Sequence, residues 1–149
     1  MNQIIILDAG PLGLITNPKF SVESKACAQW LQAHITSGSR TIIPEISDYE
    51  VRRELLRANK IKGISRLDDL AKSIEYLPIT TAAMHQAAKL WAEARQQGQP
   101  TAGDKTIDGD MILVAQAITL GSPDVVIATN VGHLSRFITA ELWQNINPI

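Results

Sequence analysis

The sequence has one cysteine, few aromatic residues and almost no net charge. Its 149 residues include 5% Phe, Trp and Tyr, and the formal net charge is −1. A lone cysteine, Cys27, excludes an internal disulfide and is typical of a reducing cytosol. Because the chain as a whole does not attract nucleic acid, any such attraction must come from a local patch of charge.

Several motifs that identify common functional classes are also missing. No apolar run approaches the length of a membrane span, and the first residues lack the pattern of a secretory signal. We therefore expect a cytoplasmic protein that has no membrane partner. No Cys/His cluster has zinc-ligand spacing, and no glycine-rich phosphate loop occurs. Cys27 is expected to be a core residue and His34 a solvated one.

Strand-like and helix-like segments alternate along the chain. The run Ile4-Ile5-Ile6-Leu7 is typical of a central parallel strand that is buried on both faces. The pattern predicts one α/β domain over residues 1–149, with three layers around a central, mainly parallel sheet. We expect a turn at residues 9–11, further strands at 40–43, 74–79, 124–128 and 143–146, and helices at 21–36, 44–57, 67–73, 80–94, 108–117 and 133–137.

Acidic residues lie where these elements begin or end. Asp8 ends the first strand, and α/β sheets bind ligands at the carboxyl ends of their strands. Asp108 is expected to cap a buried helix, with Asp110 in its first turn, where the helix dipole favours negative charge. Glu50 and Glu54 share one helix face. Glu54 is explained by pairing with neighbouring arginines on a solvated face, an explanation that fits Glu50 less well.

Three or four carboxylates at one edge of a sheet repel one another unless a cation neutralises them. Hard oxygen ligands favour Mg²⁺ or Mn²⁺. Such an ion lowers the pKa of bound water and stabilises charge on a phosphoryl group. The acidic residues are therefore compatible with metal-dependent hydrolysis of a phosphodiester.

The only basic cluster follows Glu50. Six of the 14 Lys and Arg residues fall between positions 52 and 66. A patch of this kind is usually a solvated face, but beside an acidic site it can hold a phosphate backbone. The candidates for binding nucleic acid are Arg52, Arg53, Arg57 and Lys60.

Four segments, in order along the chain, resemble conserved blocks of PIN-domain proteins and are similar to VapC-type toxin nucleases of bacterial toxin–antitoxin pairs. Residues 5–8 resemble the opening strand and first acid, and residues 46–51 the segment of the second acid, which corresponds to Glu50. Residues 110–115 resemble the block of the third acid, and residues 126–134 the closing strand with its Thr/Asn segment.

The resemblance implies a ribonuclease that requires Mg²⁺ or Mn²⁺ and hydrolyses RNA, in a family whose members are often homodimers and often inhibited by an antitoxin protein. It implies Asp8, Glu50 and Asp110 as catalytic acids, of which Asp8 and Asp110 also bind the metal, and Thr129 and Asn130 as residues that orient water. Many relatives carry a fourth acid after the last strand, where this chain has Asn130. Either Asp108 or Asp104 is a candidate to supply the missing charge, and Asp108 is then expected to be a further metal ligand.

The alternatives to a nuclease are of two classes. An enzyme with a nucleophilic Asp is not supported, because a phosphatase of the haloacid dehalogenase type with Asp8 as nucleophile needs a second Asp where Gly10 stands, and a receiver domain needs a nucleophilic Asp at the end of its third strand and a Lys after a later one, neither of which is present. The stronger alternative is a PIN fold that binds RNA or a protein without cutting. The missing fourth acid favours this binding module, whereas the presence of Asp8, Glu50 and Asp110 together favours the nuclease.

Overall fold

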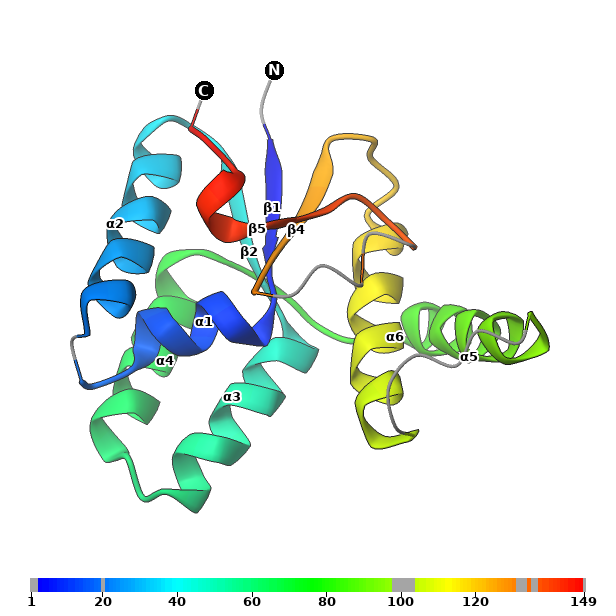
Figure 1. Ribbon diagram of the computed structural model, residues 1–149, viewed down its shortest axis with the longest axis horizontal. Coiled ribbons are helices and arrows are strands. Elements are labelled where there is room, and N and C mark those ends of the chain that lie inside the picture. The colour runs from blue at the N-terminus through cyan, green and yellow to red at the C-terminus, as the bar shows by residue number, and fades with distance from the viewer. Residues whose placement is uncertain (1–2, 20, 98–103, 131–133, 135–136, 149) are drawn as a thin grey trace.

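Five parallel strands form the central sheet of the computed structural model, which describes residues 3–19, 21–97, 104–130, 134 and 137–148 (Figure 1). The strand order is β3-β2-β1-β4-β5, and every neighbouring pair is parallel. The predicted α/β class and the central position of the first strand are thereby confirmed. The strands are β1 (Ile4–Leu7), β2 (Arg40–Pro44), β3 (Glu75–Leu77), β4 (Val125–Thr129) and β5 (Ala140–Leu142).

Helices cover both faces of the sheet and produce the expected three layers. Successive side chains of a strand point to opposite faces, so Ile5 packs with Leu12 and Cys27 on one face, whereas Ile6 packs with Leu113 on the other. No helix in the described part of the chain is long and apolar enough to cross a membrane. The first face carries α1 (Ala9–Thr16), α2 (Val22–Thr36), α3 (Glu45–Arg57) and α4 (Ile61–Ser73); the second carries α5 (Thr81–Gln96) and α6 (Asp104–Thr119).

Three helix starts differ from the prediction. The helix expected at 67–73 is α4, which begins six residues earlier, at Ile61. The expected turn after Asp8 is the first turn of α1, in which the Asp8 side chain accepts a hydrogen bond from the Ala9 N–H. Pro11 fits there because the N–H groups of a first turn have no partner within the helix. The prediction that Asp108 caps α6 is wrong, because α6 begins at Asp104. Asp108 and Asp110 therefore lie more than a turn inside the helix.

The end of the chain also differs from the prediction. The last strand, expected at 143–146, is β5, which pairs with β4 through Ile127 and Ala140. Trp143 instead begins a short 3₁₀ helix and packs edge to face on Trp30 of α2, with 5.7 Å between ring centroids. The helix expected at 133–137 falls mainly outside the described residues.

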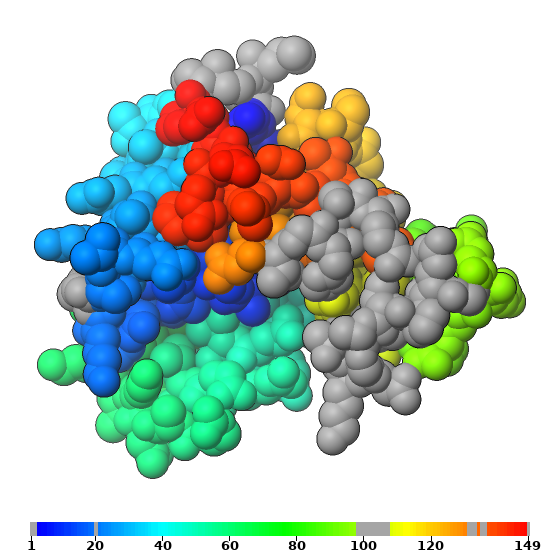
Figure 2. Space-filling view, in the orientation of Figure 1, coloured from blue at the N-terminus to red at the C-terminus, as the bar shows by residue number. Residues whose placement is uncertain are grey.

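His34 explains why the terminal segment lies on α2 (Figures 1 and 2). The prediction that it is solvated is wrong, because none of its surface is exposed. Its Nε2 lies 2.9 Å from the Ile146 carbonyl oxygen, which also accepts a hydrogen bond from the Trp30 indole at 2.8 Å. Since a carbonyl only accepts, Nε2 of His34 carries a proton. Two donors from α2 therefore hold the terminal segment in place.

Gln116 attaches α6 to the start of α3. Pro44 precedes α3 and provides no side-chain cap, which leaves the first N–H groups of the helix in need of partners. Gln116 is fully buried, and its Oε1 accepts a hydrogen bond from the Ile46 N–H at 3.3 Å. Its Nε2 donates to the Leu77 carbonyl oxygen at 2.8 Å. One amide therefore links α6, α3 and the end of β3.

We predict that Gln116→Met lowers the free energy of unfolding by about 2–4 kcal/mol, because each polar group left buried without a partner costs about 1–3 kcal/mol. Urea unfolding measures this difference. Gln32→Met is the matched control, since the Gln32 amide is exposed and, among the residues that the structure describes, donates only to Thr36. The control should change stability by less than about 0.5 kcal/mol. Equal losses in both variants would contradict the role of Gln116.

Candidate active site at the carboxyl edge of the sheet

Asp8 lies where the strand order of the sheet reverses. β1 pairs with β2 on one side and with β4 on the other, and ligands of open α/β sheets bind at such a switch point. Oδ1 of Asp8 accepts a hydrogen bond from the Ala9 N–H at 2.7 Å, and Oδ2 accepts one from the Thr129 hydroxyl at 2.8 Å. Thr129 is fully buried at the end of β4. Both oxygens of Asp8 are thus oriented by adjacent elements.

Glu50 brings a second carboxylate from α3. The residue is partly buried, and its carboxylate lies against Gly109 of α6. The pKa of Glu50 is raised above its ordinary value of 4.5, first by burial and then by the negative charge of Asp8. Asp110 raises it further, whereas the positive charge of Arg53 lowers it. The charges of Asp8 and Asp110 therefore both act on Glu50.

Asp108 is not part of this interaction. Asp108 is exposed and lines a separate groove between α5 and α6, beside Trp91 and Met111. Residues two positions apart in an α-helix are separated by about 200° around its axis, so Asp108 and Asp110 point to different sides of α6. The side chain of Asp104 lies outside the described residues.

Asn130 lies at the margin of the site, where the resemblance led us to expect a residue that orients water. It is exposed and directly follows Thr129. A Cβ atom built on Gly10 would come within 2.5 Å of the Asn130 Nδ2 atom. The Asn130 amide therefore occupies the space over Gly10, two residues after Asp8.

The donor chemistry of the site fits a hard divalent cation, because Asp8, Glu50 and Asp110 supply only carboxylate oxygens. Within the part of the chain that the structure describes, however, no three Asp, Glu, His or Cys side chains are grouped closely enough to hold a metal ion. Binding of an ion would require at least one carboxylate to move closer to the others. Glu50 is suited to such a move because its three side-chain torsions can rotate without the helix shifting.

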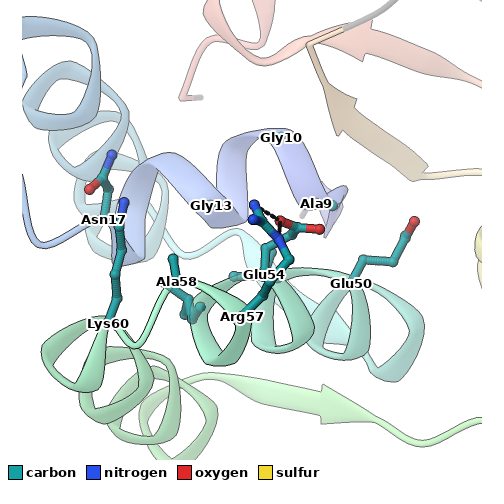
Figure 3. A pocket seen from close by; sticks show the side chains of 11 residues that line it. Ala9, Gly10, Gly13, Asn17, Glu50, Glu54, Arg57, Ala58 and Lys60 are labelled. Atoms are coloured by element: carbon teal, nitrogen blue, oxygen red, sulfur yellow. Dashed lines mark hydrogen bonds and ion pairs between the residues drawn. The ribbon is translucent and has the colours of Figure 1, made fainter.

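A groove of about 420 Å³ runs from Glu50 between α1 and α3 (Figure 3). Glu54 lies on its wall and forms an ion pair with Arg57 at 2.7 Å, in which both side chains are exposed. The Glu50 side chain points away from that pair, and Lys60 lies at the other end of the groove. α3 thus carries the candidate acid and, at its end, the candidate cation Arg57, and Lys60 follows just before α4.

Arg52 and Arg53 have other contacts. Arg52 donates to Asp48 at 3.0 Å and to Asp68 at 2.8 Å, and the Tyr76 hydroxyl also donates to Asp48 at 2.6 Å. This network ties α3 to α4 and β3, and the two carboxylates neutralise Arg52. The guanidinium carbon of Arg53 lies 5.2 Å from the centroid of the Tyr49 ring, in the range of a cation–π contact.

Sequence reasoning missed the two glycines that adjoin the acidic group. Gly10 leaves space for Asn130, and Gly109 leaves space for Glu50. A weak signal was present for Gly109, because a glycine inside a helical run is unfavourable unless packing requires it. No sequence signal could have identified their partners, which come from distant segments.

The raised pKa of Glu50 leads to a prediction about stability. Between its ordinary value and its raised value, the folded state binds more protons at Glu50 than the unfolded state, so its contribution to stability is lost as the pH rises through the folded pKa. Glu50→Gln removes that loss. Without divalent ions, the variant should exceed wild type in thermal midpoint at about pH 7, and the difference should shrink towards about pH 4.

Thermal unfolding across this pH range measures the effect. Glu54→Gln is the control, since Glu54 is exposed and faces Arg57. If the Glu50→Gln variant is no more stable than wild type at neutral pH, the charged form of Glu50 does not destabilise the folded state and the prediction fails.

Known structures share this fold. A chain in the structure of VapBC2 from Rickettsia felis bound to a promoter DNA fragment aligns with this chain at a TM-score of 0.69 and 18% identity. The alignment covers 93% of this chain and 97% of the other. For VapBC-1 from nontypeable Haemophilus influenzae the TM-score is 0.64 with 14% identity, over 95% of this chain and 99% of the other. For DNA-bound VapBC from Salmonella typhimurium the TM-score is 0.61 with 21% identity, over 96% of this chain and 99% of the other.

At these identities the likeness concerns the fold. No curated protein matches the sequence at a significant level. The family model of the PIN domain, in contrast, matches residues 6–137, a range that includes Asp8, Glu50, Asp110 and Asn130. The chain therefore belongs to the PIN-domain family.

Proposed function

We propose that this protein is a ribonuclease that hydrolyses RNA phosphodiester bonds with the help of Mg²⁺ or Mn²⁺. The observation that supports this proposal best is the electrostatic interaction of Asp8 and Asp110 with Glu50 at the switch point of a parallel sheet. Carboxylates that repel one another at a ligand-binding edge are a common feature of sites that hold a cation. Membership of the PIN family supports the same chemistry.

Each acid has a different proposed role. Asp8 and Asp110 would hold the ion, which when bound lowers the pKa of water and stabilises charge on the phosphoryl group. Asp8 suits this role because the Ala9 N–H and the Thr129 hydroxyl fix the orientation of its carboxylate. Asn130 offers an amide at the margin that can orient a water molecule.

Glu50 is the proposed proton acceptor. A general base works best when its pKa lies near the working pH, and the pKa of Glu50 is raised in that direction. As the water oxygen bonds to phosphorus, its proton passes to the Glu50 carboxylate and the bond to the departing oxygen breaks. Arg53 is close enough to act on the Glu50 charge and can limit how far its pKa rises.

The proposed biological setting is that of a toxin inhibited by an antitoxin protein. Three solved structures with a similar fold are VapBC assemblies, and two of the three contain DNA. We propose for this chain an antitoxin partner, a homodimeric state and a cytoplasmic location. Arg57 and Lys60 are the proposed contacts to the RNA backbone, because both lie beyond Glu50 along the same groove.

A PIN fold that binds RNA without cutting it is the second candidate. The described residues contain no ready set of three metal ligands, and Asn130 stands where many relatives have an acid. Such a module would bind RNA through the same basic residues, and its binding would not depend on Asp110.

Asp110→Asn separates the two candidates. The change keeps shape and hydrogen bonding but removes one charge, so we predict that RNA cleavage falls by about 100-fold or more. The thermal midpoint should stay equal or rise, because a source of repulsion has been removed. Cleavage of mixed structured and single-stranded RNAs with Mg²⁺ or Mn²⁺, together with thermal unfolding, measures both effects.

Asp108→Asn is the matched comparison, since it makes the same change two residues away on α6. Asp108 faces the groove beside Trp91, so we expect most of the activity to remain. A comparable loss at Asp108 would make it the replacement for the fourth acid. If wild type cleaves no RNA above the level of Asp110→Asn, the nuclease proposal fails and the binding module replaces it.

Replacing Arg57 and Lys60 with Ala should weaken RNA binding about equally across RNA sequences. Each lost phosphate contact also reduces the slope of log K against log [salt] by about 0.7 for single strands. Fluorescence anisotropy with a labelled RNA at several salt concentrations measures both quantities. Lys25→Ala with Lys89→Ala removes the same charge from α2 and α5 and should leave the slope unchanged. Equal effects in both double variants would assign the change to net charge alone.

A further inference from the structure

We infer that Gly109 is a positioning residue, which holds the Glu50 carboxylate in the acidic group by having no side chain. This inference rests on the proposed function, because the position of Glu50 matters to the reaction only if Glu50 takes part in it. It concerns the interface between α3 and α6 and is independent of the basic residues.

The first observation is the close approach of the two residues. A Cβ atom built on Gly109 would lie 3.0 Å from Oε2 of Glu50, 3.4 Å from its Cδ and 3.6 Å from Oε1. The whole carboxylate therefore lies over the bare backbone of Gly109, one residue before Asp110. A methyl group at this position would approach Oε2 more closely than ordinary packing allows, so the carboxylate would have to shift by a few tenths of an ångström.

The second observation is that α3 cannot simply withdraw from α6. Gln116 of α6 accepts a hydrogen bond from the Ile46 N–H, and both partners are buried. Gly109 and Gln116 are seven residues apart, so they lie on the same face of α6. Ile46 and Glu50 are four residues apart and lie on the same face of α3.

The hydrogen bond between Gln116 and Ile46 therefore holds α3 to α6 about two turns along α6 from Gly109. α3 is also tied to β3 by the Tyr76–Asp48 hydrogen bond and to α4 by the Arg52–Asp68 ion pair. A Cβ at Gly109 would therefore displace the flexible Glu50 side chain and leave the helix backbone in place. Such a displacement costs little stability but moves the carboxylate relative to Asp8 and Asp110.

The third observation is the position of the glycine within α6. Glycine inside a helix is less stable than alanine, because it loses more backbone entropy on folding. Gly109 lies in the second turn of α6 and has no positive φ angle that would require glycine. The close contact with Glu50 is the feature of the described structure that accounts for glycine at this position.

Gly109→Ala tests the inference, with Gly13→Ala as the matched control. Gly13 lies in α1 on the wall of the groove, and a Cβ atom built on it meets no atom within 4 Å, so it is a control for the thermal midpoint, the Mn²⁺ affinity and the Glu50 resonance but not for RNA cleavage. Both variants replace a helical glycine, so both should keep or raise the thermal midpoint, by up to about 2–4 °C. Only Gly109→Ala should weaken the binding of Mn²⁺, by about 10- to 100-fold, as is typical when a residue that orients a metal ligand is changed.

Titration calorimetry with MnCl₂ measures the affinity, and RNA cleavage is measured in the same buffer. A second readout does not need the metal. The ¹³C resonance of the Glu50 side-chain carboxyl, assigned by comparison with Glu50→Gln, should shift in Gly109→Ala and not in Gly13→Ala. The resonance reports the surroundings of the carboxylate directly.

The outcomes separate this inference from the proposed function. If wild type binds Mn²⁺ and cleaves RNA, and Gly109→Ala does both equally well with an unshifted Glu50 resonance, the positioning role is overturned and the nuclease proposal stands. If wild type neither binds Mn²⁺ nor cleaves RNA, the nuclease proposal fails, and the resonance alone decides whether Gly109 positions Glu50. A clear drop in thermal midpoint for Gly109→Ala would also overturn the inference, because α3 or α6 would then have moved.

Discussion

Repulsion among carboxylates is the constraint on which the arrangement of the site depends. Asp8, Glu50 and Asp110 come from a strand end and two helices, and the raised pKa of Glu50 reflects both its burial and the charges beside it. The elements that carry them resist separation because their apolar side chains fill the core on both faces of the sheet. The favourable free energy of burying that core offsets the cost of concentrating negative charge, as is common at functional sites.

Helix α3 connects the acidic site to the rest of the molecule. Its start is held by Gln116, and its middle by the bonds of Asp48 to Arg52 and Tyr76. Glu50 lies between these attachments, so its backbone is fixed although its side chain can rotate. Further along the same helix, Arg57 approaches the groove that starts at Glu50. The restrained position of α3 thus determines both where Glu50 lies and how far it lies from Arg57.

The main architecture could be predicted because local patterns agreed with it. The run from Ile4 to Leu7 is apolar at every position, which only a strand covered on both faces can satisfy. The boundaries were harder, because capping depends on which side chain reaches a free N–H. Asp8 caps a helix where a turn was expected, and α6 starts before the acid that was expected to cap it. Asp110 and Glu50 were identifiable as candidates from the motifs in which they occur.

The class of fold, the order of the strands along the chain and the candidate acids follow from local hydrophobic patterns and from short motifs, so they could be predicted from the sequence. The tertiary structure sets which polar residues meet. In it, His34 is buried under the terminal segment, Arg52 pairs with two carboxylates, and Asp108 lines the groove between α5 and α6. It also brought the Glu50 carboxylate onto Gly109. Such pairings join residues that are far apart along the chain, and their geometry depends on how the helices pack on the sheet, which no local pattern encodes.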